Sequence, residues 1–170
     1  MSKLDLSRDF IPVKIAVLTI SDTRSLSDDK SGDLLAAKLT EAGHILVKRE
    51  ITQDDVDKIT KNVTVSILDT NIDVVISTGG TGLTGRDVTP EAFRSVFDKE
   101  IEGFGEMFRY LSFQKIGTST LQSRAVAGVA GGFFIAAMAL KRLARWFSAP
   151  DHQEIEEKSD SNYLGASSHV

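Results

Sequence analysis

The sequence predicts a three-layer α/β/α domain built around a mostly parallel sheet. Three apolar runs rich in β-branched residues, at 14–20, 45–51 and 74–78, are separated by two segments with helical periodicity. Strands that alternate with helices favour right-handed crossovers and a sheet covered by helices on both faces. The 170 residues, 41% of them hydrophobic, suffice for one such domain, expected over 1–147, followed by a polar tail at 148–170 that is expected to be disordered.

The first strand and helix are expected within residues 14–43. The run KIAVLTI at Lys14–Ile20 is continuously apolar, which is typical of a strand buried on both faces of a parallel sheet. A polar loop follows, and Ser31 is the expected N-cap of a helix over 32–42. Gly43 is expected to end this helix, because a helix C-terminus commonly requires the left-handed conformation that glycine adopts.

The second strand and helix bring a further polar segment to the same edge of the sheet. A strand over 45–51 precedes a helix that starts at Asp54 or Asp55, and Val74–Thr78 is the third strand. Ligands of parallel sheets bind beyond the carboxyl ends of the strands. Three segments are therefore expected to meet at one rim: 21–31, 53–55 and 79–87.

The rest of the chain predicts two more helices before a late strand. Thr89 is the expected N-cap of a helix with Pro90 at its first position, where the missing N–H group does no harm. Apolar residues at helical spacing predict a short helix over 103–113. The run over 131–137 is typical of a strand, and the segment 138–147 of a short basic amphipathic helix.

The composition favours a small-molecule ligand. Twenty lysines and arginines against 24 acidic residues give a net charge of −4, which argues against a surface for bulk nucleic acid. No apolar run reaches the length of a membrane span and the N-terminus lacks the order of a secretory signal, so no membrane partner is expected. The absence of cysteine excludes disulfides, thiolate metal sites and a cysteine nucleophile, and it favours a cytoplasmic location.

The segment after the third expected strand has the composition of an anion site. Gly79, Gly80, Gly82 and Gly85 fall within seven residues. Glycine lets the backbone take positive φ and turn several N–H groups toward a bound oxyanion. The segment fits neither the P-loop nor the GxGxxG fingerprint. A tight strand-to-helix connection would need fewer glycines, so the pattern favours a phosphate-binding loop.

Five segments along the chain form a specific pattern in fixed order. They are SDTRSLSDDKSG, ITQDD, TGGTGLTGRDVTPEA, EIEGFGEMFRYLSF and GTSTLQSRAVAGV. A lone GGTG would be a weak signal, whereas five long motifs together are highly specific. Over roughly Ile11 to Val129 the chain thus resembles the MoaB/MogA family of molybdenum cofactor biosynthesis.

This resemblance implies a molybdopterin-binding enzyme that transfers AMP from ATP to the terminal phosphate of molybdopterin. Asp54 and Asp87 match family carboxylates implicated in adenylylation, and with nucleotide phosphates they would form an oxygen-rich Mg²⁺ site. The family forms trimers or larger assemblies such as hexamers, so a homo-oligomer is expected through the helix that contains Phe104 and Phe108. The other implied site residues are Gly79, Gly80, Thr81 and Gly82 at a phosphate, Ser112 and Ser123 near the pterin or nucleotide phosphate, and Asp29, Ser31 and Gly32 on the nucleotide side.

Each of these assignments has a structural alternative. Asp54 and Asp87 stand where aspartate commonly caps a helix. Ser112, on one face of an expected helix, would ordinarily be solvated, and Arg124 would form a surface ion pair. Two other functions stay open: a non-catalytic molybdopterin-binding or assembly protein with the same fold, and a nucleotide-binding domain with unrelated chemistry.

The resemblance fades from about Gly132 onward. Family members follow the late strand with a loop of the LPGSP type that lines the nucleotide side of the pocket, whereas this chain reads IAAMALKRLARWF. Alanine, leucine, lysine and arginine are good helix formers, so no sharp turn is expected here. We interpret the ending as a displaced reading frame or a substituted C-terminus, which a family-type ending in another frame of the coding DNA would support.

Overall fold

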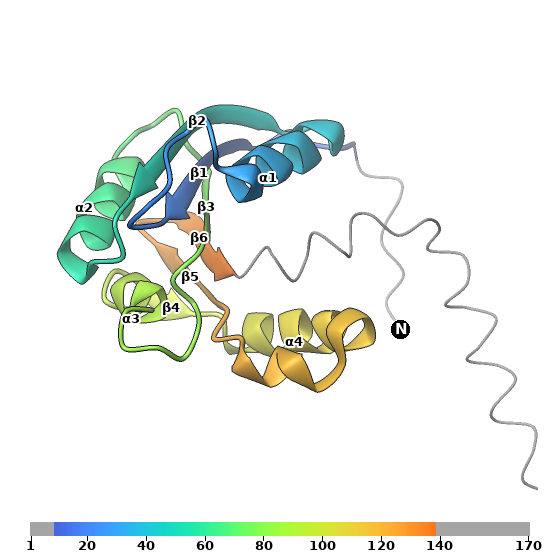
Figure 1. The fold of residues 1–170 in the computed structure, drawn as a ribbon. Coiled ribbons are helices and arrows are strands. Elements are labelled where there is room, and N and C mark those ends of the chain that lie inside the picture. The colour runs from blue at the N-terminus through green and yellow to red at the C-terminus, as the bar shows by residue number, and fades with distance from the viewer. Residues whose placement is uncertain (1–8, 139–170) are drawn as a thin grey trace, which may run out of the picture.

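The computed structural model describes residues 9–138, which form a mixed six-stranded sheet with helices on both faces (Figure 1). The strands are β1 (Lys14–Ile20), β2 (Ile45–Thr52), β3 (Val74–Thr78), β4 (Lys99–Glu100), β5 (Val126–Ala130) and β6 (Phe133–Met138). Their order in the sheet is β2-β1-β3-β6-β5-β4. The helix expected over 138–147, apart from Met138 itself, and the tail expected at 148–170 lie outside the described residues.

The expected mostly parallel sheet is confirmed in its first four strands. β1 pairs in parallel with β2 and β3, and β3 pairs in parallel with β6. β5 runs antiparallel to both β6 and β4, and Gly131 and Gly132, both at positive φ, form the turn between β5 and β6. The sequence predicts the late strand, which begins at Phe133, but neither its hairpin partner β5 nor the two-residue β4.

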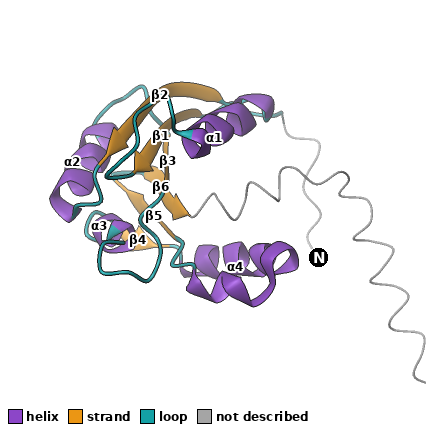
Figure 2. Cartoon of the chain, in the orientation of Figure 1, coloured by secondary structure: helices purple, strands orange, loops and turns teal. Residues whose placement is uncertain are grey.

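The helices cover the two faces of the sheet in pairs (Figure 1, Figure 2). They are α1 (Lys30–Glu41), α2 (Val56–Ile67), α3 (Thr89–Arg94) and α4 (Glu102–Ile116), with the 3₁₀ helix η1 (Gly117–Gln122) after α4. α2 and α3 pack against the face that carries Ala16 and Leu18, and α1 and α4 against the face that carries Ile15 and Val17. β1 therefore supplies alternate residues to two cores, as its continuous apolar run predicts. No helix in this part of the chain has the length and apolar character needed to cross a membrane.

Two helix starts differ from the sequence prediction. Asp29, not Ser31, caps α1, because its carboxylate accepts a hydrogen bond from Gly32 N at 3.0 Å. Val88 rather than Thr89 is the N-cap of α3, and no side chain caps that helix. In both places a residue of the right chemical type stands one or two positions inside the helix that it was expected to cap.

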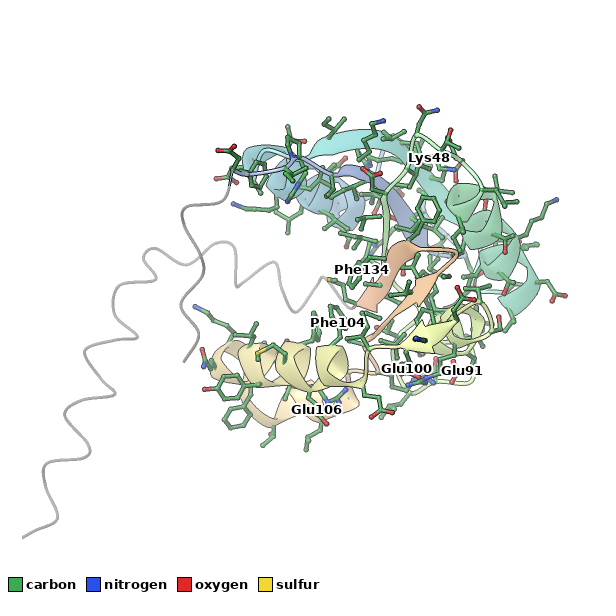
Figure 3. The ribbon with its side chains drawn as sticks, turned by 180° about the vertical axis from the view of Figure 1, so that it is seen from behind. Lys48, Glu91, Glu100, Phe104, Glu106 and Phe134 are labelled. Carbon is green, nitrogen blue, oxygen red and sulfur yellow. The ribbon has the colours of Figure 1, made fainter. Side chains whose placement is uncertain are left out.

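α4 turns aromatic side chains toward the sheet and exposes others. The ring centroid of Phe104 lies 6.3 Å from that of Phe134 in β6, and Phe108 is 7% exposed. Glu106 lies on the opposite side of the helix (Figure 3). The phenylalanines expected at an oligomer contact thus face the core instead. The exposed apolar side chains of α4 are Met107, Tyr110 and Phe113.

Candidate functional site

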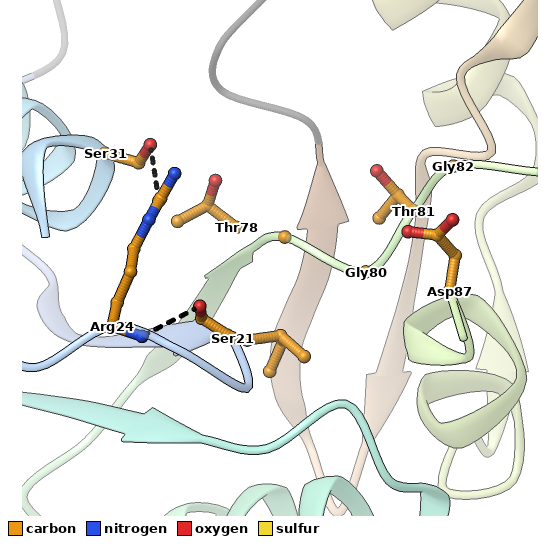
Figure 4. A pocket seen from close by; sticks show the side chains of 10 residues that line it. Ser21, Arg24, Ser31, Thr78, Gly80, Thr81, Gly82 and Asp87 are labelled. Atoms are coloured by element: carbon orange, nitrogen blue, oxygen red, sulfur yellow. Dashed lines mark hydrogen bonds between the residues drawn. The ribbon is translucent and has the colours of Figure 1, made fainter. Parts of the chain in front are cut away.

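A cavity of about 330 Å³ opens where β1 and β3 end (Figure 4). One wall, the β1–α1 wall, consists of Ile20, Ser21, Arg24 and Ser31. The other, the glycine-loop wall, consists of residues 78–82 and Asp87. Apart from Ile20 and Thr78, the last residues of β1 and β3, the two walls belong to two of the three segments expected to meet at this rim.

The backbone of the glycine loop takes conformations that side chains rarely allow. Gly79 has φ +107°, and a Cβ there would lie 2.2 Å from the carbonyl oxygen of Ile20. Gly80 has φ +58°, and a Cβ there would lie 2.1 Å from Thr89 Oγ1. The prediction of positive φ at all four glycines is wrong at Gly82 and Gly85, so only the first two depend on this freedom.

Gly82 instead makes room for Asp87. A Cβ at Gly82 would lie 2.8 Å from Asp87 Oδ2, and that oxygen accepts hydrogen bonds from Thr84 N at 2.9 Å and Thr84 Oγ1 at 2.5 Å. The carboxylate therefore closes the turn 84–87 rather than capping the helix at Pro90. Asp87 also lines the cavity, and the backbone N–H of Gly82 is a further donor to its carboxylate.

Asp54 reaches the glycine loop from the end of β2. Asp55, not Asp54, caps α2, so the Asp54 carboxylate is available to accept a hydrogen bond from Val88 N at 3.2 Å. A Cβ at Gly80 would lie within 2.8 Å of both Asp54 carboxylate oxygens. The backbone N–H of Asp54 donates to Asp22 Oδ1 at 3.1 Å. The predicted meeting of the three segments is thereby confirmed.

The two carboxyl groups have pKa values displaced in opposite directions. Burial raises the pKa of Asp54, and the nearby charges of Asp87 and Asp22 add to the rise against the hydrogen bond from Val88. Burial opposes ionisation of Asp87 too, but hydrogen bonds from Thr84 and from the backbone of Gly82, together with the charge of Arg124, outweigh it and lower its pKa. Asp87 is the more firmly ionised of the pair.

Arg124, two residues before β5, braces the glycine loop and is a residue that the sequence prediction missed. Its Nε donates to Gly82 O at 2.7 Å, and its Nη2 donates to Asp87 O, so one guanidinium holds both ends of the segment 82–87. Its Nη1 pairs with Glu91, and its backbone N–H donates to Thr81 O at 3.3 Å. The expected surface ion pair is only one of these four contacts. No local pattern signals the brace, because Arg124 lies 42 residues from Gly82.

The buried Asp29 anchors the β1–α1 wall from within. It is 0% exposed, and its carboxylate accepts from Thr19 Oγ1 at 2.6 Å, Gly32 N at 3.0 Å and Arg49 Nη2 at 3.3 Å. A Cβ at Gly32 would lie 2.1 Å from Asp29 Oδ2. Of the three residues expected on the nucleotide side, only Ser31 lines the cavity.

The two serines expected near a phosphate do not line the cavity. Ser112 is 3% exposed, and its hydroxyl donates to Phe108 O at 2.7 Å within α4. Ser123 is also 3% exposed, but its hydroxyl has no hydrogen-bond partner among the described residues. It precedes Arg124 directly, and so it lies next to the brace of the glycine loop.

The carboxylates suit a cation only together with oxygens from a ligand. Within residues 9–138 no group of three or more histidine, cysteine, aspartate or glutamate side chains is arranged to hold a metal ion. The one recorded hydrogen bond to the Asp54 carboxylate from this part of the chain goes to Oδ1, so its Oδ2 is available for coordination. The nearby Asp87 carboxylate lines the cavity. Mg²⁺ is commonly held by one or two carboxylates plus phosphate oxygens, and these residues fit that pattern.

Comparison with known proteins places the chain among proteins of cofactor biosynthesis. The family described as "probable molybdopterin binding domain" matches residues 16–147, beyond the point near Gly132 where the resemblance was expected to fade. The chain is 51% identical over 133 residues to molybdenum cofactor biosynthesis protein B of Escherichia coli (strain K12), with 78% of each protein covered. A crystal structure of a molybdenum cofactor biosynthesis protein B is similar with a TM-score of 0.77 at 38% identity, over 91% of this chain and 98% of that chain. The tungsten cofactor synthesizing protein MoaB from Pyrococcus furiosus has a TM-score of 0.64 at 29% identity, over 89% and 94% of the two chains.

Proposed function

The chain belongs to the family of probable molybdopterin binding domains, and from that premise we propose that it binds molybdopterin and transfers AMP to it from ATP. A role in molybdenum cofactor biosynthesis agrees with the names of its relatives. The transfer of AMP is more specific than the binding of molybdopterin, and the arrangement of the cavity supports it.

One observation carries the proposal: the glycine loop lines a cavity together with the carboxylate of Asp87, and the carboxylate of Asp54 lies against the same loop at Gly80. Asp87 lines the cavity beside Gly80 and Gly82, and Asp54 is hydrogen-bonded to Val88 where that loop ends. N–H groups of such a loop favour phosphate, and carboxylates beside phosphate favour a divalent cation.

In the proposed step, an oxygen of the terminal phosphate of molybdopterin attacks the α-phosphorus of ATP. A new P–O bond forms there, and the bond between the α-phosphorus and the bridging oxygen breaks, so pyrophosphate leaves with the electron pair. The attacking phosphate is already an anion at neutral pH, and no general base is required. The protein's task is therefore to align two polyanions and to offset their repulsion.

The residues of this chain would divide that task between them. The N–H groups of Gly79, Gly80, Thr81 and Gly82 would hold phosphate oxygens, and the carboxylates of Asp54 and Asp87 would hold Mg²⁺. When bound, Mg²⁺ would supply positive charge to the reacting phosphates. The lowered pKa of Asp87 keeps its carboxylate ionised and ready for that role.

An assay of AMP transfer to molybdopterin tests the proposal, with wild type and Asp87→Asn side by side. We expect the wild type to release pyrophosphate and the variant to be slower by about 100-fold, because a charged ligand to the cation has been neutralised. Equal rates would remove Asp87 from the catalytic residues. Calorimetry with ATP and Mg²⁺ separates the alternative: binding of molybdopterin without binding of ATP would leave only the non-catalytic, molybdopterin-binding function.

We also propose a homo-oligomer that buries the exposed apolar side chains of α4. Tyr110 is 63% exposed and Met107 58% exposed on the side of the helix away from the core. Large exposed apolar side chains that gather on one face commonly mark a protein–protein contact, and Met107 and Tyr110 are three residues apart on α4. Size-exclusion chromatography with light scattering should give a mass above that of the 18.5 kDa chain, and Tyr110→Glu should lower it.

A further inference from the structure

Two arginines contact the walls of the cavity and are similarly exposed, but they form different numbers of hydrogen bonds. Arg24 lines the cavity, whereas Arg124 braces the glycine loop from outside it. The side chains of Arg24 and Arg124 are 30% and 28% exposed. All three guanidinium nitrogens of Arg124 donate to the protein. For Arg24 the structure records one guanidinium hydrogen bond, from Nη1 to Ser31 Oγ at 3.3 Å. Its Nε and Nη2 have no recorded acceptor in residues 9–138, so exposure alone does not explain the difference.

Arg24 is nevertheless held in place rather than left on a loose loop. Its backbone N–H donates to Ser21 Oγ at 3.3 Å, and its Nη1 lies 3.8 Å from the buried carboxylate of Asp29. Figure 4 shows the side chain extended along the cavity toward Ser31. One edge of the guanidinium is therefore tethered, and the other N–H groups are available to a ligand.

The charge of the cavity also favours an anion beside Arg24. Among the residues that line the cavity, Arg24 is the only basic one and Asp87 the only acidic one, and they belong to opposite walls. Ser31, in the first turn of α1, brings the positive end of a twelve-residue helix to the same side as Arg24. The β1–α1 wall is thus the positive wall of the cavity.

We propose that Arg24 binds a phosphate group of the ligand, across the cavity from the N–H groups of the glycine loop. Guanidinium and phosphate match in geometry, since two parallel N–H donors meet two oxygens. The inference rests on the proposed function, because both substrates named there, ATP and molybdopterin, carry phosphate. They share the chemistry that Arg24 recognises, and binding measurements distinguish them.

The test is isothermal titration calorimetry of the full chain with inorganic pyrophosphate, ATP and molybdopterin. Arg24→Met keeps the length of the side chain but removes its charge, and we expect about 10- to 100-fold weaker binding of the ligand whose phosphate it holds. Arg24→Lys keeps the charge without the paired donors, so its loss should be smaller. Arg94→Met is the matched control, because Arg94 pairs with Glu100 away from the cavity.

Both Arg24 variants should fold, because Asp29 still accepts hydrogen bonds from Thr19 and Arg49. Their melting temperatures check this. Weaker binding of ATP and pyrophosphate would assign Arg24 to the nucleotide, and weaker binding of molybdopterin alone would assign it to the pterin phosphate. Equal affinities of wild type and both Arg24 variants for every probe would overturn the inference, as would an equal loss in Arg94→Met.

Failure of the proposed function gives a different result. If pyrophosphate binding depends on Arg24 but no AMP is transferred, the proposed function fails and the role of Arg24 stands. If AMP transfer proceeds and Arg24→Met binds every probe like the wild type, the inference alone fails. If the wild type binds none of the three probes, both fail.

Discussion

The two walls of the cavity are held in opposite ways. The glycine-loop wall is mostly backbone, and a single side chain, that of Arg124, fastens it from outside through Gly82 and Asp87. The β1–α1 wall is held from inside by the buried carboxylate of Asp29. The side chain of Arg24 in this wall lines the cavity. Arginine has a different task in each: Arg124 shapes its wall, and Arg24 presents charge from the other.

This difference predicts which wall is more sensitive to substitution. Asp29 accepts hydrogen bonds from Thr19, Gly32 and Arg49, so the loss of one donor leaves the others. For the segment 82–87, Arg124 is the one residue recorded as tying its two ends to the body of the domain. We therefore expect the largest effects of substitution in the glycine-loop wall.

Removal of the brace should have the largest effect. Arg124→Met removes the guanidinium contacts to Gly82, Asp87 and Glu91 while keeping most of the side chain's apolar length. We expect AMP transfer to fall by about 100-fold or more, because displacement of positioning groups by about 1 Å has effects of that size. Hydrogen exchange of the amides over 81–88 should become faster. Arg94→Met is the control, and unchanged exchange in Arg124→Met would show that the loop holds itself.

A methyl group at Gly80 should have the next largest effect. Gly80→Ala forces a side chain into φ +58° and toward Thr89 Oγ1 and Asp54, which should lower the free energy of unfolding by about 1–3 kcal/mol. Gly85→Ala is the matched control, because it has no positive φ and no atom within 4 Å of the added Cβ. Denaturant unfolding of both variants measures the difference. Equal free energies of unfolding in Gly80→Ala and Gly85→Ala would mean that the loop tolerates a side chain at Gly80. The glycine-loop wall would then not be the more sensitive of the two.

The strands could be predicted from the sequence more accurately than the helix starts. β1 and β3 have the bounds expected, because continuous apolar runs bordered by polar residues leave little choice of register. The start of α1 was misplaced because Asp29 and Ser31 are both good capping residues. The choice between them depends on a hydrogen bond from Thr19 to Asp29, which is a contact between β1 and the following loop.

The site could be predicted where its residues lie on predicted strand ends, and not where they act across the fold. The glycine loop, Asp54 and Asp87 all follow strands, so topology alone brings them together. Arg24 and Arg124 read as ordinary solvated charges, because arginine in a polar segment is usually exposed. Only the folded chain distinguishes the arginine whose donors are occupied from the one whose donors are available.

Neutralising the two carboxyl groups should change stability in opposite directions. Below the usual pKa of 3.8, Asp54 is protonated in both the folded and the unfolded protein. Its pKa is raised in the folded protein, so ionisation destabilises the fold as the pH rises through that folded-state value. Asp54→Asn should therefore raise the melting temperature at pH 7 but not at pH 3. Asp87 has a lowered pKa, so its stabilisation is present above 3.8 and is lost as the pH falls through the folded value. Asp87→Asn should lower the melting temperature at pH 7, and shifts of the same sign in both variants would contradict this.

The smallest effect is expected at Ser112, which belongs to neither wall. Its hydroxyl donates to Phe108 O one turn earlier in α4, a bond that slightly destabilises helices, and alanine is the better helix former. Ser112→Ala should therefore change the free energy of unfolding by less than about 1 kcal/mol and AMP transfer by less than about twofold. Ser123→Ala is the contrasting variant, because the hydroxyl of Ser123 is buried without a hydrogen-bond partner among residues 9–138. A loss of more than tenfold in Ser112→Ala with an unchanged melting temperature would mean that its hydroxyl leaves Phe108 for the ligand, as the family resemblance implies. The cavity would then have a third wall, formed by α4.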